Sequence, residues 1–252
     1  QVRRSSDGAT SDIGFVGGQL DTAALSTFAA GGDAFVATWY DQVGSAHVVQ
    51  STADSQPQIV AGGSVLTDPV NGLPALRFSD NNKKLNYANS WIDVETMSVF
   101  SAAAWFPWTD PPSYNDSMAR RLWTVHLSTS TRSAVGGHGG EFALNYRDTT
   151  PALRSPQSGT SIVGNEPFVT SYLYDASQAA SSDWVRLRLN GTQIAEYTGL
   201  TLDSSANGFT IGSGGDQKRH FDGLIQELVV YGSVLSAADV TRVEGDMMGL
   251  YI

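Results

Sequence analysis

The sequence contains no cysteine, which excludes disulfide bonds, thiolate nucleophiles and cysteine-based zinc sites. It also contains no run of about 18 apolar residues of the kind that spans a bilayer. The first residues, Gln1-Val2-Arg3-Arg4, lead directly into polar residues and not into an apolar stretch. We therefore expect no signal peptide at this end and no insertion into a membrane.

Basic residues are few, with 15 Lys and Arg against 25 Asp and Glu, so the net charge is −10. Nucleic acid is not an expected partner, because its phosphates would be repelled. Disordered chains are poorer in apolar residues than this one, which is 41% hydrophobic. No linker of proline, glycine or serine divides the 252 residues. We predict a single domain over 1–252, with residues 1–33 as an N-terminal elaboration of it.

Short β-type runs, broken by Gly, Asn, Asp, Ser and Pro, dominate the sequence. The expected strands are residues 34–40, 75–78, 97–106, 121–127, 141–146, 168–174, 184–189, 193–197, 209–211 and 224–231. This many strands with little helical signal predict an all-β fold, an antiparallel β-sandwich of jelly-roll type.

One hairpin is well specified by residues 185–198. The Val and Leu residues of 185–189 alternate with Arg186 and Arg188, so the arginines are expected to face water and the others the core. The following Asn190-Gly191 suits a two-residue type I′ turn, in which both positions need positive φ.

Two short helices are also predicted, each expected to plug an edge of the sandwich. Asp21 can cap a helix over 22–30, and Ser236 can cap one over 237–248, with Asp239 three residues after the cap. The apolar stripe of the second helix consists of Val240, Val243 and Met247.

Five segments, in order along the chain, resemble the landmarks of concanavalin A-like, laminin-G-like jelly-roll domains. They are WYDQVGS (39–45), NGLPALRF (71–78), LNGT (189–192), FTIG with FDGLIQEL (209–212 and 221–228), and LS before the last helix (235–236). The resemblance implies the same jelly-roll fold for this chain. Such folds host lectins, hydrolases, lyases and structural parts of virions, so the resemblance alone leaves the function open.

A second resemblance is narrower and concerns residues 2–15 together with 38–42. These segments are similar to sequences of phage and bacterial surface proteins, and distantly to the start of α-L-arabinofuranosidase B catalytic domains. Those enzymes carry cysteine pairs, which this chain does not have. No residue here is matched to their catalytic carboxylates.

Aromatic residues near polar ones give the clearest binding signal. Trp108 and Tyr114 fall in a proline-rich stretch with Asp110 and Asp116, and Trp91 lies in a second polar stretch. Sugars pack their C–H faces on such rings, while carboxylates accept hydrogen bonds from their hydroxyls. The alternative is that these rings cover the core or a homo-oligomer interface.

Glu141 and His138 are the candidate catalytic residues, because they flank a glycine-rich loop, residues 136–140, that could let a sugar approach the backbone. A glycosidase needs two carboxylates roughly 5–10 Å apart, and no motif here supplies the second. The alternative reading is a hairpin loop with a solvated acid. Asp41 and Glu227 are interpreted as structural, Asp41 as the cap of a turn.

No histidine pair has the spacing of a zinc site. Calcium, which the laminin-G-like resemblance allows, is the one cofactor considered, and Asp80, Asn81 and Asn82 could offer oxygen ligands.

Together these features favour a non-catalytic, lectin-like carbohydrate-binding module whose partner is a polysaccharide or cell-surface glycan. We expect it on the outside of a cell or a virion, as a receptor-binding or adhesive part of a phage particle or bacterial surface protein. The alternatives are a polysaccharide-degrading glycoside hydrolase or lyase, and a purely structural virion or scaffold domain.

Overall fold

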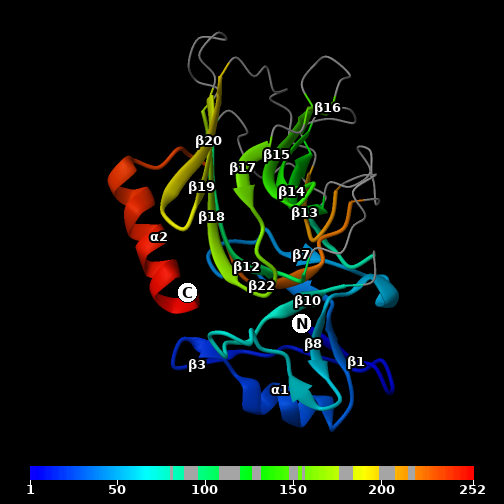
Figure 1. The fold of residues 1–252 in the computed structure, drawn as a ribbon. Helices are drawn as coiled ribbons and strands as arrows, with labels where there is room; N and C mark the ends of the chain where they lie inside the picture. The colour runs from blue at the N-terminus through cyan, green and yellow to red at the C-terminus, as the bar shows by residue number, and fades with distance from the viewer. Residues whose placement is uncertain are drawn as a thin grey trace.

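The fold is an antiparallel β-sandwich of two stacked sheets with two α-helices (Figure 1), as expected from the sequence. The computed structural model describes residues 1–79, 82–87, 96–107, 120–126, 132–147, 153–154, 157–175, 184–198, 208–214 and 219–252. All strand pairs within this part of the chain are antiparallel.

The larger sheet has the strand order β2-β1-β5-β8-β10-β22-β12-β18-β19-β20, with β9 paired to β8. Its strands are β1 (Val2–Arg4), β2 (Thr10–Ser11), β5 (Ala34–Val36), β8 (Gln58–Ala61), β9 (Ser64–Val65), β10 (Leu76–Phe78), β12 (Thr96–Trp105), β18 (Pro167–Asp175), β19 (Trp184–Leu189), β20 (Thr192–Thr198) and β22 (Gly223–Tyr231).

The smaller sheet has the order β16-β15-β14-β13-β21-β11-β7-β6, with β17 paired to β15. Its strands are β6 (Thr38–Trp39), β7 (Val48–Val49), β11 (Leu85–Tyr87), β13 (Arg120–His126), β14 (Arg132–His138), β15 (Glu141–Arg147), β16 (Leu153–Arg154), β17 (Gln157–Ser161) and β21 (Gly208–Ile211). The remaining elements are the hairpin β3 (Phe15–Val16) and β4 (Gln19–Leu20), the 3₁₀ turn Ala53–Ser55, α1 (Thr22–Ala29) and α2 (Ala237–Tyr251).

The main core lies between the two sheets and is rich in aromatic rings. The Trp123 ring of the smaller sheet meets Tyr172 of the larger edge to face, at 5.1 Å between centroids. Phe142 meets Phe168 in the same manner at 5.0 Å. Edge-to-face ring pairs contribute stabilising free energy beyond the burial of apolar area, so these contacts help to hold the two sheets together.

A second apolar cluster lies on the other side of the larger sheet, beneath α2. Along β18, Phe168, Tyr172 and Tyr174 join the core, while Val169 and Leu173 pack with the stripe of α2. Figure 1 shows α2 along this outer side of the sheet, away from the smaller sheet. The expectation that this helix plugs an edge is therefore wrong. β18 has apolar side chains on both faces, so each face must be covered by another element.

Neither described helix is long and apolar enough to cross a membrane.

Local signals in the sequence are confirmed at the helix starts and at the hairpin. The Asp21 carboxylate accepts a hydrogen bond from the Ala24 N–H, and the Ser236 hydroxyl accepts one from the Asp239 N–H. At the hairpin turn Asn190 has φ 47° and Gly191 has φ 76°. The two helix caps and the hairpin turn could be predicted from the sequence because each depends on the chemistry of residues close together in the chain.

The segment 34–40, expected as one strand, is instead two strands in different sheets. β5 pairs with β1 in the larger sheet, and β6 pairs with β7 in the smaller one. Between them the Ala37 N–H donates to the Gln1 carbonyl, and the Ala37 carbonyl accepts from the Gln50 N–H. The chain therefore passes from one layer to the other within this short stretch, which its uniform β-type composition does not reveal.

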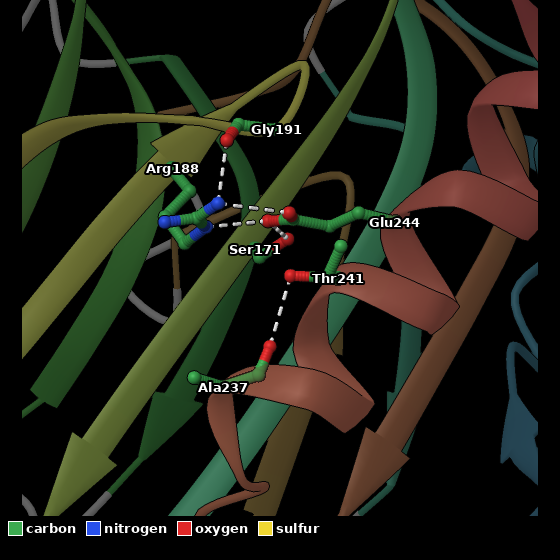
Figure 2. Close-up of polar contacts among 6 residues, drawn as sticks. All are labelled: Ser171, Arg188, Gly191, Ala237, Thr241 and Glu244. Atoms are coloured by element: carbon green, nitrogen blue, oxygen red, sulfur yellow. Dashed lines mark hydrogen bonds and ion pairs between the residues drawn. The ribbon is translucent and has the colours of Figure 1, made fainter.

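A buried ion pair joins α2 to the larger sheet (Figure 2). The Arg188 Nε donates to Glu244 Oε1 at 2.7 Å, and the Ser171 hydroxyl donates to the same oxygen at 2.7 Å. Glu244 raises the pKa of the Arg188 guanidinium through this hydrogen bond. The expectation that the arginine face of β19 meets water is thus wrong at Arg188, because α2 covers it, whereas Val185 and Leu187 are buried in the core as expected.

We predict that Glu244→Ala lowers the free energy of unfolding by about 3 kcal/mol, because it leaves a partly buried guanidinium without its carboxylate. Asp246→Ala, at an exposed position of the same helix, is the matched control and should change it by less than about 0.5 kcal/mol. Urea unfolding measures both variants. Equal midpoints for the two would contradict the anchoring of α2 by Glu244.

Candidate functional site

One face of the smaller sheet points away from the core and carries polar and small residues. Val135 of β14 and Leu144 of β15 pair with each other and point into the core. The alternate residues Ala134, Gly136 and Ala143 point the other way, and the two alanines belong to none of the apolar clusters of the described residues. We call this side of the sheet the polar face; it carries Asn86, Thr210, Thr124, Arg121, His138 and Glu141.

A row of hydrogen-bonding side chains crosses the middle of the polar face. The register places Thr210 between Asn86 and Thr124 on the neighbouring strands. The Thr210 hydroxyl donates to Asn86 Oδ1 at 3.0 Å, and the Thr124 hydroxyl donates to the Ser213 carbonyl at 3.0 Å. Both threonines are buried, so these bonds fix their rotamers and make this part of the face rigid.

Arg121 lies on the same face and is fully buried. A bulge after it inserts Leu122, so that Leu122 and Trp123 both enter the core while Arg121 stays opposite Gly136. A single parallel bridge also brings His220 beside Arg121. This bridge pairs the backbones of Arg121 and His220.

Gly136 has a steric reason to be glycine. A Cβ at this position would overlap the carbonyl oxygen of Arg120 on the adjacent strand and come within 2.9 Å of the Arg121 Cα. The absence of a side chain therefore lets β13 and β14 approach closely at the bulge. The polar face is left without side-chain bulk at this point.

Glu141 and His138 face each other across the turn that joins β14 to β15. The sequence suggested one glycine-rich loop, but only Gly139 and Gly140, with φ of 60° and 84°, form the turn, and the two glycines before His138 lie in β14. Glu141 Oε2 accepts a hydrogen bond from the Gly159 N–H at 3.1 Å. The acid is therefore half-buried and tied to β17, not freely solvated.

Charge is unevenly distributed over this sheet. Within its described strands Glu141 is the only acidic residue, in a protein whose net charge is −10. The same strands contain five arginines, at positions 120, 121, 132, 147 and 154. The Glu141 carboxylate can accept hydrogen bonds from sugar hydroxyls, while a second carboxylate for hydrolysis would have to come from outside these strands.

Two other acids have structural positions, as the sequence suggested for them. Asp41 caps a turn, and its carboxylate accepts from the N–H groups of Val43, Gly44 and Ala46; the bond from Val43 contributes most to lowering the pKa of Asp41. Glu227 lies against Tyr251 at the end of α2. Burial and this neighbouring carboxylate raise the pKa of the Tyr251 phenol.

The remaining candidate residues are not brought into this site by the described part of the structure. Trp108, Tyr114, Asp110, Asp116 and Trp91, with the calcium candidates Asp80 and Asn81, lie outside the described residues. Asn82 is described and exposed. Among the described residues no group of three or more His, Asp or Glu side chains could hold a metal ion.

Sequence reasoning found Glu141 and His138 but missed Arg121, Thr124 and Thr210. Thr124 and Thr210 each lie between two large apolar residues of their strand, and this alternation is the signal that marks a second face. Arg121 does not follow the alternation, because the bulge at Leu122 interrupts it.

We predict that Gly136→Ala lowers the free energy of unfolding by about 2–3 kcal/mol, since β13 and β14 must separate to admit the methyl group. Gly245→Ala, where an added Cβ meets open space on α2, should be neutral or stabilising by up to about 1 kcal/mol. Thermal unfolding of both variants gives the comparison. Equal stability of Gly136→Ala and the wild type would mean that the close approach of the strands is not required.

Solved structures with the same fold include two α-L-arabinofuranosidases. One is an arabinofuranosidase complexed with arabinofuranosyl-α-1,2-xylobiose, and the other a GH54 α-L-arabinofuranosidase mutant soaked with 4-nitrophenyl α-L-arabinofuranoside. Each is 16% identical with a TM-score of 0.69, and each alignment covers 99% of this chain and 58% of the other. This chain therefore spans less than two thirds of the length of these enzymes.

A third similar structure is the binding domain of Paraclostridial Mosquitocidal Protein 1, with a TM-score of 0.54 and 11% identity over 79% of this chain and 51% of that one. At these identities the likeness concerns the fold alone. The chain has no significant match among curated protein sequences.

The sequence itself matches a family model over residues 80–241, which include β11 to β22 and the start of α2. The matched segment thus contains most of the smaller sheet and the polar face, and it covers well over half of the chain. The chain belongs to the concanavalin A-like lectin/glucanases superfamily.

Proposed function

We propose that the protein is a carbohydrate-binding module that holds its ligand against the polar face of the smaller sheet. The observation that carries this proposal is the polar face itself: a sheet whose core side is filled with apolar rings carries a buried, hydrogen-bonded polar row on its other side, and Glu141, His138 and His220 remain partly exposed at its edge. Burying polar groups costs free energy unless they are paired, and Thr124 and Thr210 are paired.

The half-exposed groups at the edge of this face are suited to contact with a sugar. Glu141 can accept hydrogen bonds from sugar hydroxyls, while His138 and His220 can donate or accept them. The small residues Ala134, Gly136 and Ala143 are themselves buried, so a sugar would contact the partly exposed groups at the edge of the face. The hydrogen-bonded row beneath holds the contact geometry fixed, which lowers the ordering cost of binding.

Stacking rings would complete such a site. Trp108, Tyr114 and Trp91 remain the predicted ring contacts, with Asp110 and Asp116 as partners for hydroxyls. The similar enzymes were solved with arabinofuranosides, which supports arabinose-containing polysaccharides as the first ligands to try. A place on a phage particle or a bacterial surface remains our prediction for the setting in which the module acts.

We expect Glu141→Ala to weaken retention on immobilised arabinan or arabinoxylan by about 10- to 100-fold, because it removes a charged hydrogen-bond acceptor. Trp108→Ala and Tyr114→Ala should each weaken it by about 5-fold or more through lost stacking. Affinity electrophoresis across a polysaccharide panel measures retention. The control is Glu166→Ala, which removes an exposed acid from a turn and not from the polar face.

Melting temperatures within about 2 °C of the wild type would confirm that the variants remain folded. If Glu141→Ala is retained as strongly as Glu166→Ala on every polysaccharide, the polar face is not the binding site.

Glycoside hydrolysis is a second candidate function, favoured by the position of Glu141. This carboxylate is held by the Gly159 N–H on the face that we assign to the sugar. A retaining glycosidase uses one carboxylate as nucleophile and a second as acid and base, with the two about 5 Å apart. The second would have to come from a segment outside the strands of the smaller sheet.

This candidate predicts that the wild type releases 4-nitrophenolate from 4-nitrophenyl α-L-arabinofuranoside and that Glu141→Gln lowers kcat by about 10²- to 10⁴-fold. The glutamine can still accept the bond from the Gly159 N–H, so folding and sugar binding should persist. A wild type that binds arabinan without any turnover would eliminate the enzyme and leave the binding module.

A further inference from the structure

A hollow of about 430 Å³ lies at the end of the molecule that carries α1, apart from the polar face. Its walls come from β4, from α1, from β9 and from the turn around residues 67–74. A cavity of this size is within the range of small-molecule sites. Its lining includes Gly72, Leu73 and Pro74 of the landmark at 71–78, and no described residue of the polar face lines it.

Five polar side chains surround this hollow, and none of them carries a charge. They are Gln19, Thr22, Ser26, Ser64 and Thr67. Within the described part of the chain, none of the five makes a side-chain hydrogen bond to another residue. By contrast, the hydroxyl of Thr27, the residue after Ser26 in α1, donates a hydrogen bond to the Ala23 carbonyl at 2.8 Å. All but Ser26 are exposed, so these groups around the hollow are free to hydrogen-bond to water or to the hydroxyls of a ligand.

Apolar groups supply the rest of the lining. Leu20, Val65, Leu73 and Pro74 offer C–H surface between the polar groups. No aromatic ring and no ionisable side chain lines the hollow. This mixture excludes an ionic ligand as the natural occupant and matches a neutral molecule with hydroxyl groups on its rim and C–H groups on its face.

The walls are held in place by backbone contacts. The Gly63 N–H donates to the Gly32 carbonyl at 2.9 Å, which joins the β8–β9 turn to the end of α1. On the other side Asp68 Oδ1 accepts from the Val70 N–H at 2.8 Å, and the Asn71 amide donates to the Tyr251 carbonyl at 2.7 Å. The hollow is therefore formed before any ligand arrives, which favours binding by a small rigid molecule.

We propose that this hollow is a second, separate binding site for one or two rings of a neutral saccharide. It does not depend on Glu141 or on any catalytic step. Hydroxyls of the ligand would pair with Ser26, Ser64 and Thr67, and its C–H face would rest on Leu73 and Pro74. Without an aromatic ring to stack on, such a site binds weakly, so its effect in a polymer would come from acting together with a first site.

The test uses the whole chain and saturation-transfer NMR with xylose, arabinose, glucose, galactose and their β-1,4-linked or α-1,5-linked disaccharides as probes. Ser26→Leu, which fills the hollow, should lower the affinity for the responding probe at least 10-fold. Thr67→Ala, which removes one hydroxyl, should lower it about 5-fold. Thr27→Ala, on the same helix but outside the hollow, should leave it unchanged.

Ser64→Leu is a second variant that fills the hollow, from an exposed position of β9. It replaces Ser26→Leu in the comparison if Ser26→Leu lowers the melting temperature. Glu141→Ala separates the two proposals, because it should leave this site intact while weakening retention at the polar face by about 10- to 100-fold. The proposal is overturned if none of the probes binds, or if the binding that remains in Glu141→Ala is unaffected by both leucine variants.

Discussion

The strict alternation of side chains along a β-strand is the constraint on which this protein is built. β12 and β18 alternate between two apolar partners, the smaller sheet on one side and α2 on the other, so neither face of the larger sheet is free. Within the described residues, β13 and β15 join an apolar cluster on one side only, and their alternate residues are polar or small. Most of this second face is buried, so we propose that binding takes place at its edge, where Glu141 and His138 are partly exposed.

The fold and its local turns could be predicted because short-range chemistry decides them. Asn190-Gly191, the caps Asp21 and Ser236, and the turn held by Asp41 each depend on neighbours a few residues away. The family landmarks have a similar basis: Asn71, in one of them, joins its own turn to the end of α2 and to Gln226. A pattern that is fixed locally can be recognised without knowing the tertiary structure.

The rest could not be predicted because it depends on contacts between distant segments. Gly136 and Gly137 suggest a loop in the sequence, yet both lie in β14. Position 136 is a glycine because the backbone of the neighbouring strand leaves no room for a side chain. Arg188 looks exposed until α2, 56 residues later, supplies Glu244. In the candidate site, Glu141 was visible as an acid near glycines, whereas Thr124 and Thr210 became meaningful only when the strand order placed them side by side.

The passage of the chain between layers near Ala37 has a mechanical consequence. In most sandwiches the layers are joined by loops, which deform easily and let one layer slide over the other. Here a backbone amide bonded to Gln1 and a carbonyl bonded to Gln50 lie between two short strands, one in each layer. Shear between the layers would have to break these bonds first. The two layers are therefore tied directly by backbone hydrogen bonds near β5 and β6, and these bonds resist sliding of one layer over the other at this point.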